Sequence, residues 1–219
     1  MELQSFTDLA RAPDPALDRL ALALAAEVRD VDAPAALATL DALGDELSRA
    51  LEGRERTPAA ELATVAEVLG GRHGFHGETT DYDNPDRSML DLVLVRRVGL
   101  PILLSVLYVE VARRAGVPLA GVGLPGHFVV GHFGADPVPL LADPFRGGAP
   151  LPVALAPAIV RGWTARETAL RMLNNLVSAY TVRHDLGRAI RTAELRLSVA
   201  GGDREALELE LRGLRARLN

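Results

Sequence analysis

The chain has 219 residues, of which 48% are hydrophobic and 24% are charged, and its formal net charge is −5. This length and composition are typical of one globular domain with a helical addition and exclude a globally disordered chain. The sequence has no cysteine and no block of basic residues, which excludes disulfides, thiolate metal sites, a cysteine nucleophile and nonspecific binding to nucleic acid.

The N-terminal residues are not expected to form a targeting signal. Residues 1–8 lack a basic region followed by an apolar stretch, so they do not form a secretory signal. The most apolar segment, residues 100–109, ends at Glu110 after ten residues, whereas a membrane-spanning helix needs about 20. We therefore expect a cytoplasmic protein that does not interact with a membrane.

Residues 14–70 are predicted to form a layer of helices. Leucines recur at helical spacing after Pro15, and a second helix starts with Asp32 as its N-cap. A third helix opens at Thr57-Pro58 and stops at Gly70-Gly71. The polar residues of these helices are expected to face solvent, so no chemistry is assigned to them.

Residues 71–86 form a polar connection that contains His73 and His76. A long segment with few apolar residues is often functional. No third ligand lies near the two histidines in the sequence, so we expect no metal site, and no motif for a cofactor is found.

The next two helices are predicted to form the centre of the domain. The first ends at Gly99, and the second starts with Pro101 in its first turn and closes at Gly116. The second helix is apolar around most of its circumference, apart from Ser105 and Glu110. A helix of this kind is buried in the middle of a domain.

Short strands follow the central helix. Residues 117–124, 127–133 and 138–143 are rich in aliphatic residues, and turn residues separate them. We expect an antiparallel hairpin packed on the central helix, which makes the fold class α+β.

The C-terminal part is predicted to be helical. Helices are expected at about 165–183 and 188–199, and an arginine- and glutamate-rich helix follows. The helix–turn–helix resembles one tetratricopeptide unit, whereas stable solenoids need about three. The predicted domains are therefore residues 1–162 and a tail, residues 163–219, which must dock on the main domain or bind a partner.

Two polar residues of the hairpin can face each other. His127 opens one strand and Asp143 ends the next, and a carboxylate in this position can fix the tautomer of a catalytic histidine. The alternative is that each side chain makes its hydrogen bonds locally, with His127 at the start of its strand and Asp143 capping a turn. His132, five residues after His127, is expected to point to the other face and into solvent.

Short motifs follow one another over residues 82–148: Tyr82-Asp83, Ser88-Met-Leu90, Arg96-Arg97, Gly99-Leu-Pro-Ile102, Leu104-Ser105, Tyr108, Glu110-Val-Ala-Arg-Arg114, Gly116-Val117, Pro125-Gly-His-Phe128 and Asp143-Pro-Phe145 with Gly147-Gly148. In this order they closely resemble the transglutaminase-like family, and within it the SirB-type branch of bacterial proteins with a tetratricopeptide tail. The tail of this chain is shorter than in typical relatives, and Arg87 stands where relatives tend to have asparagine.

The resemblance implies a papain-like α+β core with an N-terminal helical layer and a C-terminal helical hairpin. It also implies a triad in which His127 is the histidine and Asp143 is the aspartate. The family's cysteine falls at or next to Pro101, where no thiol is available. Ser105, the nearest hydroxyl, is either a substitute nucleophile or a packing residue that bonds back to a helix carbonyl.

Three functions remain open from the sequence. The first is a non-catalytic protein that keeps the pair His127 and Asp143 and contacts an unidentified protein partner. The second is a weak hydrolase or acyl transferase in which His127 activates water or Ser105. The third is an adaptor whose core carries the tail. The oligomeric state is not predicted.

Overall fold

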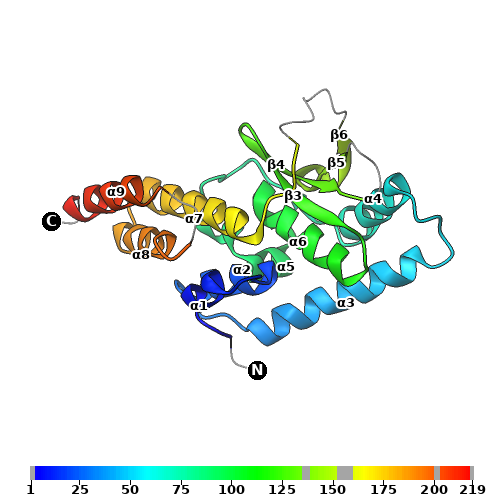
Figure 1. Cartoon of the computed structure of the whole chain (residues 1–219), viewed down its shortest axis with the longest axis horizontal. Coiled ribbons are helices and arrows are strands. Elements are labelled where there is room, and N and C mark those ends of the chain that lie inside the picture. The colour runs from blue at the N-terminus through cyan, green and yellow to red at the C-terminus, as the bar shows by residue number, and fades with distance from the viewer. Residues whose placement is uncertain (1–2, 135–138, 152–159, 200–202, 218–219) are drawn as a thin grey trace.

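The computed structural model describes residues 3–134, 139–151, 160–199 and 203–217. Within these residues the chain forms an elongated molecule with a small sheet and a central helix in the middle (Figure 1). Val138, the predicted start of the third strand, and the predicted break at Gly201-Gly202 lie outside the described residues.

Four helices form the N-terminal layer: α1 (Phe6–Arg11), α2 (Leu17–Ala26), α3 (Ala33–Leu51) and α4 (Pro58–Ala66). The predicted cap of α3 is confirmed, because Oδ1 of Asp32 accepts a hydrogen bond from the Ala35 amide. The Thr57 hydroxyl caps α4 in the same way and accepts a hydrogen bond from the Ala60 amide. These bonds satisfy amides that a helix start leaves without partners.

The polar connection after α4 contains more regular structure than the sequence indicates. The end of the predicted third helix forms the π-helical turn η1 (Glu67–Arg72), which leads into the connection, and the connection contains the short strand β1 (His76–Gly77). β1 pairs in parallel with β2 (Val98–Gly99), which directly precedes the central helix. This pairing was not predicted, because two residues are too few to show a strand pattern.

The central helix α6 (Pro101–Arg114) follows the 3₁₀ turn η2 (Pro85–Ser88) and helix α5 (Leu90–Arg96). Its start at Pro101 and its burial are as predicted: Leu103, Leu107 and Val111 are fully buried. Gly116 has φ +68° just after the helix, a conformation that glycine adopts without steric cost.

The main sheet has four antiparallel strands in the order β3-β4-β5-β6. Their bounds are β3 (Leu119–Leu124), β4 (His127–His132), β5 (Leu140–Asp143) and β6 (Ala149–Leu151). Leu124 pairs with His127 across the Pro125-Gly126 turn, in which Gly126 has φ +71°. β6 was not predicted from the sequence. The mixture of helices with a small antiparallel sheet is consistent with the expected α+β class.

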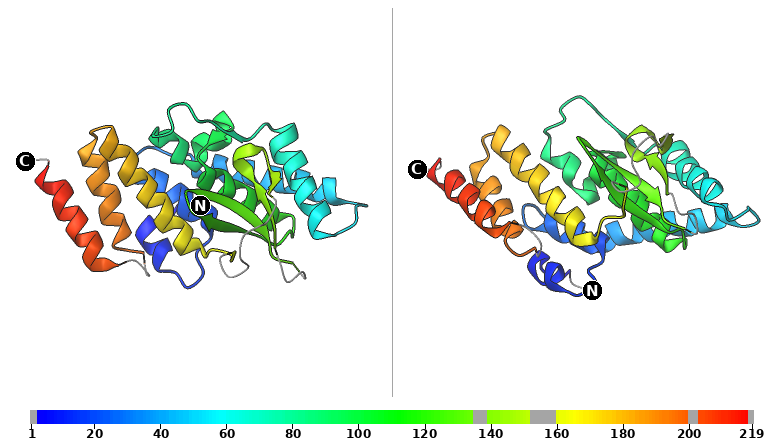
Figure 2. Two further views of the ribbon diagram at one scale, coloured as in Figure 1. Left: turned by 90° about the horizontal axis from the view of Figure 1, so that it is seen from above. Right: turned by 45° about the horizontal axis from the view of Figure 1, so that its top comes forward.

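The main hydrophobic core surrounds α6 and continues into the C-terminal helices. These are α7 (Ala165–Val182), α8 (Leu186–Arg196) and α9 (Arg204–Ala216). Met172, Leu173 and Leu176 of α7 belong to the same buried cluster as α6. Figure 2 shows α7, α8 and α9 side by side at one end of the molecule, with α7 nearest to the sheet. Helix α7 therefore docks on the core. No helix in the described part of the chain could cross a membrane.

Candidate functional site

The central helix begins at or next to the position that the resemblance assigns to the family's cysteine. Pro101 is the first residue of α6 and is buried, and Leu100 before it is extended. A proline has no nucleophilic atom and no backbone N–H. This helix start therefore offers neither a thiol nor an amide donor at Pro101.

The hairpin brings His127 and Asp143 together. Val130 pairs with Ala142 in the antiparallel register. The next step of this register places Val129 opposite Asp143, so His127, two residues before Val129, lies diagonally across from Asp143. Nε2 of His127 lies 3.0 Å from Oδ2 of Asp143, and the two side chains are 31% and 4% exposed. A buried carboxylate thus lies against an imidazole that solvent reaches.

The turn after β5 fixes the Asp143 carboxylate. Oδ1 accepts a hydrogen bond from the Phe145 amide over 3.0 Å, and Nε of Arg146 lies 3.8 Å from Oδ2. The Phe145 ring meets the His127 ring edge-on, with 6.2 Å between centroids. The arrangement can hold one imidazole nitrogen in a fixed direction and leave the other free for a ligand or a proton.

Tyr108 of α6 is a residue of this site that the sequence analysis did not single out. It is buried, and burial, together with the negative charge of Asp143, raises the pKa of its hydroxyl. Within the described residues this hydroxyl has no hydrogen-bond partner. In the sequence, the only sign of a role for Tyr108 is that it belongs to the motifs shared with the family. Its position on an apolar helix is equally typical of an ordinary core residue.

Ser105 lies one turn inside α6, with no exposed surface. Its Oγ is buried and has no hydrogen-bond partner among the described residues, so the expected bond back to a helix carbonyl is not formed. Complete burial keeps Ser105 from solvent and from any substrate in this conformation.

His132 corrects an expectation, because it is buried rather than exposed to solvent. Its Nε2 lies 2.6 Å from Oε2 of Glu61, and its Nδ1 accepts a hydrogen bond from the Gly134 amide. These partners assign the proton to Nε2. Glu61 of α4 also pairs with Arg56. Although burial raises the pKa of Glu61, hydrogen bonds from His132 and Arg56 outweigh it and hold this pKa below its usual value.

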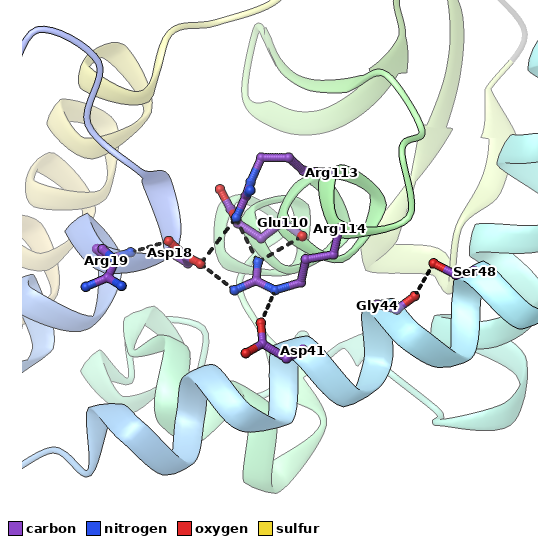
Figure 3. Close-up of polar contacts among 8 residues, drawn as sticks. All are labelled: Asp18, Arg19, Asp41, Gly44, Ser48, Glu110, Arg113 and Arg114. Carbon is purple, nitrogen blue, oxygen red and sulfur yellow. Dashed lines mark hydrogen bonds and ion pairs between the residues drawn. The ribbon is translucent and has the colours of Figure 1, made fainter. Parts of the chain in front are cut away.

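Two buried acids therefore overturn the expectation that polar residues of the N-terminal helices face solvent. Glu61 is one, and Asp18 of α2 is the other. Asp18 belongs to a charged cluster, defined here as Asp18, Asp41, Glu110, Arg113 and Arg114 (Figure 3). The cluster joins α2 and α3 to the end of α6.

The two histidines of the polar connection have separate partners. Nε2 of His73 lies 2.7 Å from Oε2 of Glu46, and Nδ1 of His76 lies 2.8 Å from the Gly74 carbonyl. Across residues 3–134, 139–151, 160–199 and 203–217, no group of three or more histidine, aspartate or glutamate side chains is placed to hold a metal ion.

The family of the chain follows from comparison with known proteins. The family model described as "Transglutaminase-like superfamily" matches residues 34–190, which include the site and reach into α8. The chain belongs to the transglutaminase-like superfamily.

Several curated proteins are similar to the chain. A UPF0162 protein of Xylella fastidiosa is 36% identical over 166 residues, which cover 67% of this chain and 58% of that protein. A UPF0162 protein of Pseudomonas aeruginosa is 37% identical over 140 residues, which cover 64% of this chain and 50% of that protein. The chain thus spans little more than half the length of these curated relatives.

A shorter match occurs in a much longer protein. Human F-box only protein 21 is 45% identical over 69 residues, which cover 32% of this chain and 11% of that protein. No solved structure matches the chain.

Proposed function

We propose that this transglutaminase-like protein is non-catalytic and acts as a binding or regulatory module for a protein partner. The observation that carries the proposal is the missing nucleophile. The sequence has no cysteine, and α6 begins with Pro101. Nucleophilic catalysis at this position requires a thiolate activated by the helix start and by a nearby imidazole.

The retained pair supports a binding role. His127 is partly exposed and is held by a buried carboxylate. An imidazole oriented in this way can exchange a hydrogen bond with a ligand through its second nitrogen. The pair then contributes to recognition without forming a covalent intermediate.

The C-terminal helices are the proposed contact with the partner. α7 docks on the core through buried side chains, whereas α9 exposes Leu209. The match within F-box only protein 21 covers only 11% of that protein, which supports the use of this kind of domain as a module of larger proteins.

Incubation of the protein with amide and thioester model substrates tests the proposal. We expect no turnover above that of His127→Ala, which removes the imidazole and whose fold is checked by circular dichroism. Turnover that the His127→Ala substitution abolishes would overturn the non-catalytic assignment.

A second candidate is a weak hydrolase in which His127 activates a water molecule. The accessible imidazole beside a buried carboxylate favours it. Asp143→Asn separates the two candidates, because it disturbs the histidine's orientation and leaves the volume of the site unchanged. Hydrolysis that falls in both His127→Ala and Asp143→Asn supports the hydrolase.

A further inference from the structure

A pocket of about 320 Å³ lies between the start of α2, the end of α6, strand β3 and the start of α7. Its walls include Leu17, Val109, Leu119 and Trp163. They provide aliphatic surface on several sides and one aromatic ring. The pocket does not include His127 or Asp143 and is lined by different residues from the site described above.

Glu110 contributes to the wall of this pocket and is also the buried acid of the charged cluster. The residue is 2% exposed. Its Oε2 accepts hydrogen bonds from Nε of Arg113 at 2.9 Å and from Nη1 of Arg114 at 3.0 Å. Within the described residues no hydrogen bond reaches Oε1. Glu110 therefore lines the pocket, and one oxygen of its buried carboxylate is still able to accept a hydrogen bond.

The charges around Glu110 do not balance within the cluster. Arg114 donates to Asp18 and Asp41 at 2.7 Å each, and Nη2 of Arg113 lies 3.7 Å from Asp18. Three carboxylates thus share two guanidinium groups (Figure 3). A further carboxylate, Asp14, lines the pocket together with the guanidinium-bearing Arg113, and both residues are exposed. A single positive charge entering the pocket would offset part of this surplus.

We propose that this pocket binds a primary ammonium group carried on a short aliphatic stem. The ammonium donates to Oε1 of Glu110, and the stem lies along Leu17 and Val109. One free oxygen favours an ammonium over a guanidinium, because a guanidinium makes its strongest contact with both oxygens of a carboxylate. Trp163 adds an apolar wall, although its ring already has Arg161 at 6.0 Å from the centroid.

The inference is independent of the proposed function, because it uses no residue of the His127 site. A free alkylamine and a lysine side chain present the same ammonium chemistry. Comparison of n-butylammonium with Nα-acetyl-lysine amide separates these two sources.

Trp163 provides the readout, since it is the only tryptophan of the chain and lines the pocket. We expect n-butylammonium chloride to change its fluorescence saturably at pH 8, and sodium chloride at equal ionic strength to leave it unchanged. Neutral n-butanol should bind about tenfold more weakly, because it lacks the charge-assisted hydrogen bond. Saturable binding of the lysine derivative as well would assign the site to lysine side chains, and its failure would assign the site to free amines.

Two variants test the role of the carboxylates. Glu110→Gln should weaken n-butylammonium binding about tenfold or more, and circular dichroism checks that this variant folds. Asp14→Lys changes an exposed residue and should weaken binding about threefold by repulsion at the rim. Glu52→Gln, an exposed glutamate outside the pocket, is the matched control and should bind as the wild type does. Absence of saturable binding, equal binding of n-butanol, or unchanged affinity in both Glu110→Gln and Asp14→Lys would overturn the proposal.

Discussion

Nε2 of His132 donates a hydrogen bond to Oε2 of Glu61 across 2.6 Å, and this buried contact joins strand β4 to helix α4. The two residues are 71 positions apart in the chain. Neither side chain is part of the triad remnant. The pair is a structural tie between the sheet and the N-terminal layer.

Removal of the carboxylate should be costly. Glu61→Ala leaves His132 without its acceptor and Arg56 without its ion pair, so we expect the free energy of unfolding to fall by about 3 kcal/mol. Chemical denaturation measures this change. The control, Glu52→Ala at an exposed position, should change it by less than about 0.5 kcal/mol. A loss of similar size in both variants would contradict the structural role of the pair.

The acidity of Glu61 should also appear in the pH dependence of stability. Its pKa is lowered from 4.5 in the folded chain, so the unfolded state binds this proton more readily. The contribution of the Glu61 carboxylate to the free energy of unfolding is therefore complete above about pH 4.5. It is lost as the pH falls through the folded-state pKa. Denaturation curves of the wild type and Glu61→Gln should converge on acidification. Curves that move apart on acidification would contradict a lowered pKa for Glu61.

Glu110 should have the opposite pH dependence. Burial, followed by the negative charge of Asp18, raises its pKa above 4.5 despite the two arginines. The folded state then binds this proton more readily, so the associated stability is present below about pH 4.5 and is lost as the pH rises through the folded-state pKa. The stability of Glu110→Gln relative to the wild type should therefore increase from pH 4 to pH 8, measured by thermal unfolding. A decrease in this relative stability over the same range would show that Arg113 and Arg114 outweigh burial and Asp18 in setting the pKa of Glu110.

The hydroxyl of Tyr108 should contribute nothing to stability. It is buried without a hydrogen-bond partner among the described residues, so Tyr108→Phe removes a polar group that folding leaves unsatisfied. We expect the free energy of unfolding to stay equal or to rise by up to about 1 kcal/mol. The neighbouring Leu107→Ala, at a fully buried position, should lower it by about 2–5 kcal/mol. A loss above about 1 kcal/mol in Tyr108→Phe would indicate a bound water or ligand.

The sequence predicts local features of this fold well, because their causes are local. Asp32 caps α3 and Pro101 opens α6 as expected, since caps and first-turn prolines act on their own helix. One hairpin carries both His127 and Asp143, so their proximity is one of the two arrangements that the sequence allows. The triad roles came only from the family resemblance.

Long-range pairing explains what the sequence does not predict. Alternation along β4 places His132 on the face opposite His127, but it does not say what covers that face. Helix α4 covers it and supplies Glu61. Asp18 is similarly buried by arginines from the end of α6, about a hundred residues away. Polar residues on a helix are predicted to face solvent, and this prediction fails for Glu61 and Asp18 because their partners lie far along the chain.

Turnover of a thioester substrate by the wild type and by His127→Ala tests the central claim most directly. The chain has no cysteine, and its remaining His127 and Asp143 lie together without an adjacent thiol. We expect the two proteins to give the same rate, equal to that of buffer. A wild-type rate above buffer that disappears in His127→Ala, while circular dichroism shows an unchanged fold, would contradict the account.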